Sequence, residues 1–276
     1  MKRIFYGLVL LVLAVVLSAC GSNESEEPQA TEGSSEDAAK SSENLLENIK
    51  AKGELLIGTE GTYPPYTFHN EQDELTGFDV EIAREVAKRL GVEPVFKETK
   101  WDSMFAGLNS ERFDMVANQV GITPERQEKY SFSEPYIQSS AVIVTHEDNE
   151  SITSFDDLSG VKTAQSMTSN FAKIAKENGA DITSVEGFNE SMQLLSSKRV
   201  EATVNDRLSV LDFKKQRPDA PVKIAARQDE ASKSGLLFRQ GNDELVEAVN
   251  QALNEMKEDG TYVEISQKWF GEDVSK

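Results

Sequence analysis

The chain has 276 residues, with 48 Asp or Glu against 29 Lys or Arg and a formal net charge of −19 at pH 7. This acidic balance argues against nucleic acid or an anionic lipid surface as a partner, because both attract basic proteins. The chain has one cysteine, Cys20, so no disulfide can form within it and its core alone must hold the fold.

The first twenty residues have the layout of an export signal. Lys2 and Arg3 precede an apolar run that ends at Leu17 and is followed by small residues up to Cys20. The run is too short to span a membrane comfortably, so residues 1–19 are interpreted as a secretory signal peptide. The Leu-Ser-Ala-Cys ending resembles the lipobox of bacterial lipoproteins, in which Cys20 becomes the lipidated amino terminus. An ordinary signal peptide with an incidental cysteine is the alternative.

Residues 20–44 are rich in Ser, Glu, Gly and Ala and contain almost no large apolar side chain. Such a segment cannot bury enough surface to fold, so we expect a disordered tether between the anchor and the folded part. The remaining residues, 45–276, are about the number at which a single core begins to divide in two.

Short apolar runs alternate with amphipathic stretches in the folded part, a pattern typical of α/β proteins with largely parallel sheets. In a first series, strands are expected at 54–58, 92–98 and 113–117, helices at 78–90 and 101–109, and an extended run at 141–144. In a second series, strands are expected at 161–164, 182–185, 202–204 and 222–225, and helices at 169–178, 192–198 and 208–215. An extended run at 235–238 and helices at 244–257 and 262–269 close the chain.

The repeated series predicts two lobes joined by two crossing strands. We expect lobe 1 to contain residues 45–141 and 237–276, and lobe 2 to contain residues 142–236. This topology leaves a cleft between the lobes and two strands that can act as a hinge.

Four polar segments directly follow predicted strands, at 58–63, 118–121, 165–170 and 205–206. Ligands of open α/β sheets bind beyond the carboxyl ends of the strands, where loop amides and helix amino termini converge. Two of the segments belong to each predicted lobe, so they could face each other across the cleft.

Part of this polar set suits a carboxylate. Arg126 offers a planar fork that keeps its charge at any usable pH, and Gly121 lets the backbone approach closely. Thr168 and Ser169 lie where a helix is expected to begin, and the free amides of a helix start attract an anion.

The rest of the set suits an ammonium group and an apolar stem. Asp206 and Glu60 can accept from an ammonium, and Tyr63 and Trp101 offer flat apolar faces. Purely structural roles remain open for these residues. Asp206 could serve merely as a helix cap, and Tyr63 or Trp101 could serve merely to pack the core. Likewise, Arg126 could simply lie at the end of a solvent-exposed helix.

Together these features resemble the solute-binding proteins of polar amino acid ABC importers, and most closely the cystine-binding members. The likeness extends from about residue 55 to residue 271. It is carried, in order, by GTEGTYPP at 58–65, LTGFD at 75–79, NQVGITPER at 118–126, FSEPY at 132–136, TAQS at 163–166, ND at 205–206 and WFG at 269–271.

The resemblance implies a two-lobed α/β fold of the periplasmic-binding-protein type II. It also implies a monomeric capture protein, attached to the membrane only through a lipid on Cys20, that closes over one amino acid and delivers it to a membrane permease. No metal and no cofactor are expected. Many polar amino acid binders have serines where this chain has Asn118, Gln119 and Gly121, and the shift favours cystine or another uncharged or doubly zwitterionic amino acid over lysine, arginine or histidine.

The resemblance also implies residue roles. Arg126, with backbone groups of Gly121 and Thr168, is expected to hold the α-carboxylate, and Asp206 to accept from the α-ammonium. Tyr63 and Trp101 match the positions that form the aromatic walls of the family's binding pocket. Glu60 matches a position where many members have an acidic residue that lines this pocket. The complete expected binding set is Glu60, Tyr63, Trp101, Asn118, Gln119, Val120, Gly121, Arg126, Ser166, Met167, Thr168, Ser169 and Asp206.

Two other functions stay open. A dehydratase-like enzyme on the same fold would need a general acid with a shifted pKa, for which Glu60 and Asp206 are the candidates. The sequence offers no Ser-His-Asp set, no cysteine nucleophile and no metal-ligand spacing. A sensory amino acid-binding module is the other alternative, although we find no signalling domain or second membrane segment in the sequence.

Overall fold

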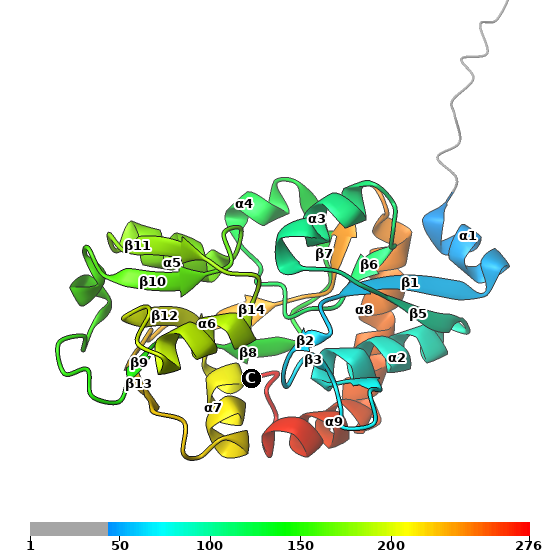
Figure 1. Ribbon diagram of the computed structural model, residues 1–276. Coiled ribbons are helices and arrows are strands. Elements are labelled where there is room, and N and C mark those ends of the chain that lie inside the picture. Colours follow the sequence, from blue (N-terminus) through cyan, green and yellow to red (C-terminus); the bar gives the residue numbers. More distant parts are fainter. Residues whose placement is uncertain (1–43) are drawn as a thin grey trace, which may run out of the picture. The chain divides into compact units, whose positions relative to one another are not determined.

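A computed structural model describes residues 44–276 of the chain (Figure 1). The predicted signal peptide, Cys20 and nearly all of the predicted tether lie outside the described residues. Within the described part, no helix is both long enough and apolar enough to cross a membrane. The first helix, α1 (Leu45–Lys52), was not expected from the sequence; Asn44 caps its start, and Gly53, with φ of 72°, ends it.

The first sheet has the strand order β5-β1-β6-β15-β7. Its strands are β1 (Glu54–Thr59), β5 (Glu93–Glu98), β6 (Met115–Val116), β7 (Tyr130–Phe132) and β15 (Leu237–Arg239). Strand β1 runs parallel to β5 and β6, and β15 runs antiparallel to β6 and β7. Because β15 enters the sheet from a point more than one hundred residues after β6, the first lobe is built from two separate parts of the chain.

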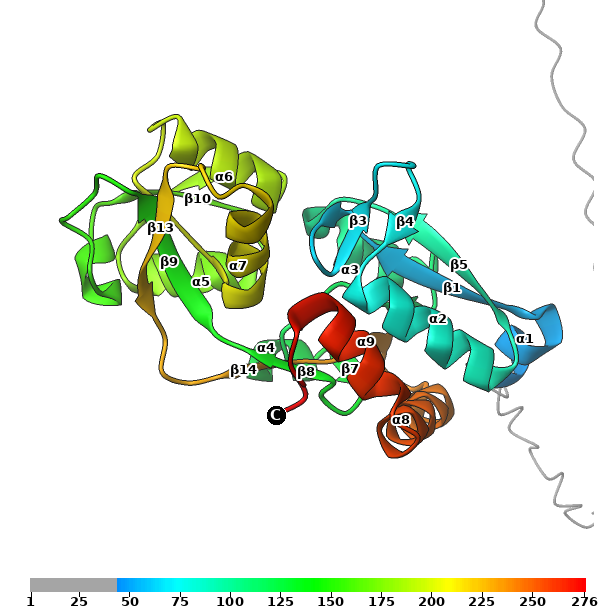
Figure 2. The ribbon, with the colours of Figure 1, turned by 90° about the horizontal axis from the view of Figure 1, so that it is seen from below.

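Five helices accompany this sheet: α2 (Phe78–Leu90), α3 (Trp101–Asn109), α4 (Pro124–Gln127), α8 (Asp243–Glu258) and α9 (Thr261–Phe270). Helices α2 and α3 begin and end at the predicted residues. Helix α2 buries Val80, Ala83 and Ala87 at helical spacing, and Gly91 in the left-handed conformation ends it. Helices α2, α8 and α9 pack against one another (Figure 2).

The second sheet has the strand order β11-β10-β12-β9-β13. Its strands are β9 (Ala141–His146), β10 (Lys162–Gln165), β11 (Asp181–Ser184), β12 (Ala202–Asp206) and β13 (Val222–Arg227). The helices that accompany this sheet are the 3-10 helix η1 (Phe155–Leu158), α5 (Asn170–Glu177), α6 (Phe188–Ser196) and α7 (Arg207–Gln216). Helix α6 starts four residues before the predicted residue 192. Its apolar face includes Phe188, which packs on Phe213 and on Tyr63 of the first lobe.

Two crossings connect the sheets, from β8 (Ile137–Ser139) to β9 and from β13 to β14 (Ser232–Ser234) (Figure 2). Strands β8 and β14 pair in antiparallel register between the two sheets. A small sheet of β2 (Thr62–Tyr63), β3 (Thr67–His69) and β4 (Leu75–Thr76) completes the first lobe. The fold therefore has two α/β lobes and a two-strand hinge, while the lobe boundaries at 141/142 and 236/237 stay a prediction.

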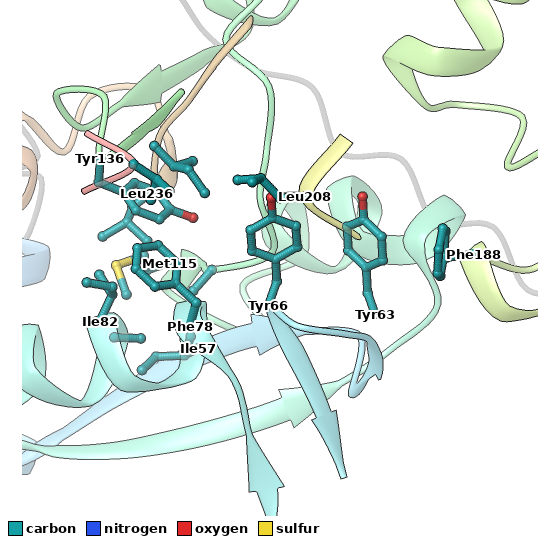
Figure 3. Close-up of a cluster of buried hydrophobic side chains, with 14 of the residues drawn as sticks. Ile57, Tyr63, Tyr66, Phe78, Ile82, Met115, Tyr136, Phe188, Leu208 and Leu236 are labelled. Atoms are coloured by element: carbon teal, nitrogen blue, oxygen red, sulfur yellow. The ribbon is translucent and has the colours of Figure 1, made fainter. Parts of the chain in front are cut away.

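A chain of aromatic side chains extends from the core of the first lobe to the second. Figure 3 shows Tyr136 over Phe78, and Tyr66 beside Tyr63 with both hydroxyl groups pointing the same way. The ring centroids of Tyr63 and Tyr66 are 5.3 Å apart, and Phe188 of the second lobe lies 5.8 Å from Tyr63. The tyrosines that pack the core thus bring their hydroxyl groups to the place where the lobes meet.

Candidate functional site

A small cavity lies where the carboxyl ends of β1 and β6 face those of β10 and β12. Its walls come from both lobes: Glu60, Tyr63, Trp101, Asn118 and Gln119 from the first, and Gln165, Ser166, Ser169, Asn170, Phe171, Gly187, Phe188, Ser191 and Asn205 from the second. The four polar segments singled out in the sequence therefore meet at one place.

The predicted binding residues divide into three groups. The cavity is lined by Glu60, Tyr63, Trp101, Asn118, Gln119, Ser166 and Ser169. A wider and more open hollow, which shares Ser169 and Asn170 with the cavity, is lined by Arg126, Met167 and Thr168. The remaining three, Val120, Gly121 and Asp206, line neither hollow; Val120 and Asp206 have no exposed surface.

Glu60 and Asn118 are joined by two hydrogen bonds. The Asn118 side chain donates from Nδ2 to Oε2 of Glu60 at 2.6 Å and accepts at Oδ1 from the Glu60 backbone N–H at 2.7 Å. Burial raises the pKa of the Glu60 carboxyl to about 7, and the bond from Asn118 opposes this rise. Asn118 therefore fixes the direction of an acidic side chain in the cavity wall.

Arg126 has no acidic partner among the described residues. Its guanidinium donates from Nη1 to the carbonyl oxygen of Gly121 at 2.8 Å and lies 5.3 Å from the ring centroid of Trp101 and 5.2 Å from that of Phe105. The neighbouring Glu125 is occupied by an ion pair with Lys173. Burial lowers the pKa of Arg126 to about 10, so the group stays charged at neutral pH and its fork keeps free donors.

Asp206 is fully buried and accepts hydrogen bonds at both of its carboxylate oxygens. At Oδ1 it accepts from the Tyr66 hydroxyl at 2.8 Å and from two backbone N–H groups that it caps at the start of α7, at 2.9 and 3.1 Å. At Oδ2 it accepts from Nε2 of Gln119 at 3.2 Å. Burial raises the pKa of Asp206, and these bonds oppose the rise. The structure shows the helix-capping role of Asp206. Its contact with a ligand ammonium stays a prediction.

Gln119 contacts a second buried carboxyl group through its backbone. Its N–H donates to Oδ2 of Asp79, and its φ of 49° lies in the left-handed region that few residues other than glycine adopt. Burial raises the pKa of Asp79 to about 7. Asp79 lies in the LTGFD segment that carries part of the resemblance, and the structure shows that it holds the loop 118–121 in place.

Polar contacts bridge the lobes around the cavity. Thr168 donates from its hydroxyl to Oδ1 of Asp102 at 2.6 Å, and Tyr63 donates to Oδ1 of Asn205 at 3.1 Å. Two ion pairs, Lys100 with Glu186 and Glu125 with Lys173, add charged contacts at the surface. Exposed ion pairs contribute only about 0–1 kcal/mol each. The hydrogen bonds that Asn205 and Asp206 accept from the first lobe are buried, whereas the bond from Thr168 to Asp102 is exposed.

Several lining residues were absent from the predicted set: Gln165, Asn170, Phe171, Gly187, Phe188, Ser191 and Asn205. Gln165, Asn170 and Asn205 belong to the polar segments at strand ends and could have been included on that ground. Gly187, Phe188 and Ser191 lie at the start of α6, which carries no polar run, and only the packing of α6 against Tyr63 brings them to the cavity.

Comparison with known proteins identifies the family. The sequence profile of the bacterial extracellular solute-binding proteins, family 3, matches residues 55–272. The chain belongs to this family. The predicted family, the two-lobed fold and the role of a solute-binding component are thereby confirmed, and the family description places the protein outside the cytoplasm.

Individual relatives allow a closer comparison of sequence and structure with this family 3 protein. It is 50% identical to the L-cystine-binding protein TcyA of Bacillus subtilis (strain 168) over 277 residues, which covers both chains completely. It is 51% identical to the L-cystine solute receptor of Neisseria gonorrhoeae in the unliganded open conformation, with a TM-score of 0.57 over 84% of this chain and 99% of that one. An ancestral arginine-binding protein bound to arginine is 40% identical, with a TM-score of 0.75 over 79% of this chain and 98% of that one.

The two structural comparisons also bear on how the lobes are arranged. Sequence identity is higher with the open, unliganded receptor, yet structural agreement is better with the arginine-bound protein. Within this structure, hydrogen bonds from Tyr66 and Gln119 to Asp206 join the two lobes directly.

Proposed function

We propose that this protein captures an amino acid, L-cystine in the first place, between its two lobes and delivers it to an ABC permease in the membrane. The observation that carries the proposal is the pair of unmatched charges beside one small cavity. Among the described residues, Arg126 is a partly buried cation without an acidic partner, and Glu60 is a partly buried acid without a basic one. A zwitterion supplies both missing partners.

Cystine is favoured over other amino acids by two considerations. Two relatives that share about half of their sequence with this chain are described as an L-cystine-binding protein and an L-cystine solute receptor. The cavity also presents neutral amides, Asn118 and Gln119, beside one acid, which suits a polar ligand without net charge better than arginine or lysine. We further propose that Cys20 carries the lipid anchor and that the protein acts as a monomer.

Calorimetric titration of the purified protein with the set of natural amino acids and L-cystine tests this assignment. We expect L-cystine to bind with a dissociation constant near or below micromolar, or about 8 kcal/mol, and the other amino acids to bind more weakly. Tight binding of arginine or lysine together with no binding of cystine would reject the ligand, and no binding of any amino acid would reject the function.

One observation favours an enzyme as a second candidate. The pKa of about 7 for Glu60 is what a general acid in a dehydratase-like reaction would need. The cavity has no activated nucleophile, and no described cluster of His, Cys, Asp or Glu could hold a metal ion. We therefore propose binding without chemical change. Recovery of unaltered ligand after prolonged incubation with the protein supports this proposal, and conversion that Glu60→Gln abolishes would establish the enzyme.

A further inference from the structure

Two buried side-chain donors in the cavity wall lack a hydrogen-bond partner within residues 44–276. They are Nε2 of Gln165 and Nε1 of Trp101. Gln165 is 2% exposed and Trp101 is 7% exposed, and both line the cavity. Gln165 ends β10 in the second lobe, whereas Trp101 begins α3 in the first. The cavity wall therefore has an unpaired N–H donor on each side of the lobe interface.

An unpaired donor in a protein interior is costly. It has given up its hydrogen bonds with water, and nothing in the described chain replaces them. Trp269 shows that one unpaired indole N–H does not by itself make a site. Its Nε1 is also buried without a partner, but the ring packs on Phe68 outside the cavity. Gln165 and Trp101 differ from it because they are two donors that line one hollow.

The chemistry of the cavity wall indicates which group these donors bind. No Lys, Arg or His is among the residues that line the cavity, and the amides of Asn118 and Gln119 already donate to carboxylates. An anionic group in the cavity therefore depends on neutral donors, and Gln165 and Trp101 are the buried ones without a partner. The terminal amide of a glutamine rotates between two orientations of similar shape, so its N–H groups can turn toward such a group.

The position of Arg126 indicates how a ligand brings an anionic group there. The wider hollow that contains Arg126 shares Ser169 and Asn170 with the cavity. Under the proposed function Arg126 holds one carboxylate, and L-cystine carries a second carboxylate at the other end of its disulfide-linked chain. A ligand whose first carboxylate lies at Arg126 can extend past Ser169 and Asn170 and place its second head group in the cavity.

We propose that Gln165 and Trp101 bind the second carboxylate of L-cystine through their side-chain N–H groups. The inference rests on the proposed function and adds a specificity site to it. A carboxylate has lone pairs for several donors, so it can accept from both residues once the lobes close over it. Gln165 thereby has a ligand role that the sequence did not indicate, and Trp101 has a polar role beside its apolar face. Amino acids with a single head group leave both donors unpaired and bind less tightly.

Calorimetric titration with a matched pair of ligands tests this role. The mixed disulfide of L-cysteine and cysteamine lacks the second carboxylate and otherwise keeps the structure of L-cystine. A hydrogen bond to a charged group contributes about tenfold or more in affinity, so the wild type should bind L-cystine about a hundredfold more tightly than the mixed disulfide. Gln165→Met and Trp101→Phe each remove one donor and should each lower this ratio about tenfold. Lost packing affects both ligands and therefore leaves the ratio unchanged.

Two variants serve as matched controls. Trp269→Phe removes a buried, unpaired N–H outside the cavity, and Gln251→Met removes an exposed amide of α8. Both should keep the wild-type ratio. Gln165→Met should also keep its melting temperature without ligand, because it replaces an unsatisfied donor by an apolar side chain of similar length.

The outcomes separate the inference from the proposed function. Equal affinity of the wild type for L-cystine and for the mixed disulfide overturns the site for the second carboxylate and leaves the proposed function standing. A wild-type ratio that persists in Gln165→Met and in Trp101→Phe also overturns it, because other groups then hold the carboxylate. If no amino acid binds to the folded wild type, the proposed function itself fails.

Discussion

The side-chain amide of Gln119 donates to Oδ2 of Asp206 across the lobe interface at 3.2 Å. Gln119 lines the cavity, whereas Asp206 has no exposed surface. A ligand ammonium that binds Oδ2 of Asp206 would therefore compete with the Gln119 amide. Until such a group binds, Gln119 supplies the hydrogen bond that the ammonium would supply.

Replacing Gln119 by glutamate tests this relationship. Gln119→Glu keeps the shape but removes the donor and places a third acid beside Asp206 and Asp79. We expect a loss of about 1–3 kcal/mol of stability, with the melting temperature falling more at pH 8 than at pH 5, where the acids are more protonated. The surface control Gln240→Glu should leave the melting temperature unchanged at both pH values. Equal melting temperatures of Gln119→Glu and wild type would show that the amide makes no important contact.

The hydroxyl group of Tyr66 provides a second prediction. It donates to Asp206 at 2.8 Å and joins the two lobes in a buried place. Tyr66→Phe should lower the free energy of unfolding by about 1–2 kcal/mol and favour a more open arrangement of the lobes. Denaturant unfolding and small-angle scattering of the ligand-free protein measure these effects.

The control for this prediction is Tyr130→Phe. Tyr130 accepts from Asn109 at an exposed position of the first lobe, so loss of its hydroxyl group should change neither measurement. Identical scattering of Tyr66→Phe and wild type would mean that this bond does not hold the lobes together.

Stability of the ligand-free protein should fall as pH rises through neutrality. Burial raises the pKa of Glu60 from 4.5, and that of Asp79 from 3.8, to about 7 in the folded protein. Each group therefore stabilises the fold at pH below its unfolded value, and this contribution is lost as pH rises toward and through 7. The loss should be on the order of 2 kcal/mol for each group between pH 5 and pH 8, and about twice that for the two groups together.

Melting curves from pH 5 to pH 8 test this direction. Asp79→Asn keeps an acceptor for the Gln119 backbone and removes the ionisable group, so its melting temperature should change less with pH than that of the wild type. A melting temperature of the wild type that rises from pH 5 to pH 8 would contradict the assigned shifts.

The sequence predicts most regular elements, and the reasons for success are local. Helix α2 is bounded by Gly77 and Gly91, and its apolar residues repeat at helical spacing. The sequence misses elements whose existence depends on contacts between residues that are distant in the chain. Strands β2 and β4 have two residues each, too few to show a period, and β8 pairs with β14 across more than ninety residues of chain.

The site was predicted less completely than the fold. Polar residues at strand ends identified Glu60 and Asn118, because strand order places those ends together. The hydrogen bonds of Asp79 with Gln119 and of Tyr66 with Asp206 could not be predicted, because they join residues that are distant in the chain and meet only through side-chain packing. For the same reason, the sequence indicated Arg126 as a carboxylate ligand but not its contacts with the rings of Trp101 and Phe105.

Titration of Arg126→Ala with L-cystine tests the central claim most directly, namely that this guanidinium is reserved for a ligand carboxylate. Removing the positive partner of a carboxylate should weaken binding by at least about 30-fold, or 2 kcal/mol, while melting falls by no more than the loss of a cation–π contact, about 1 kcal/mol. Arg84→Ala removes a comparable cation–π contact with Phe96 away from the cavity and should bind as the wild type does. Wild-type affinity in a folded Arg126→Ala protein would contradict the account.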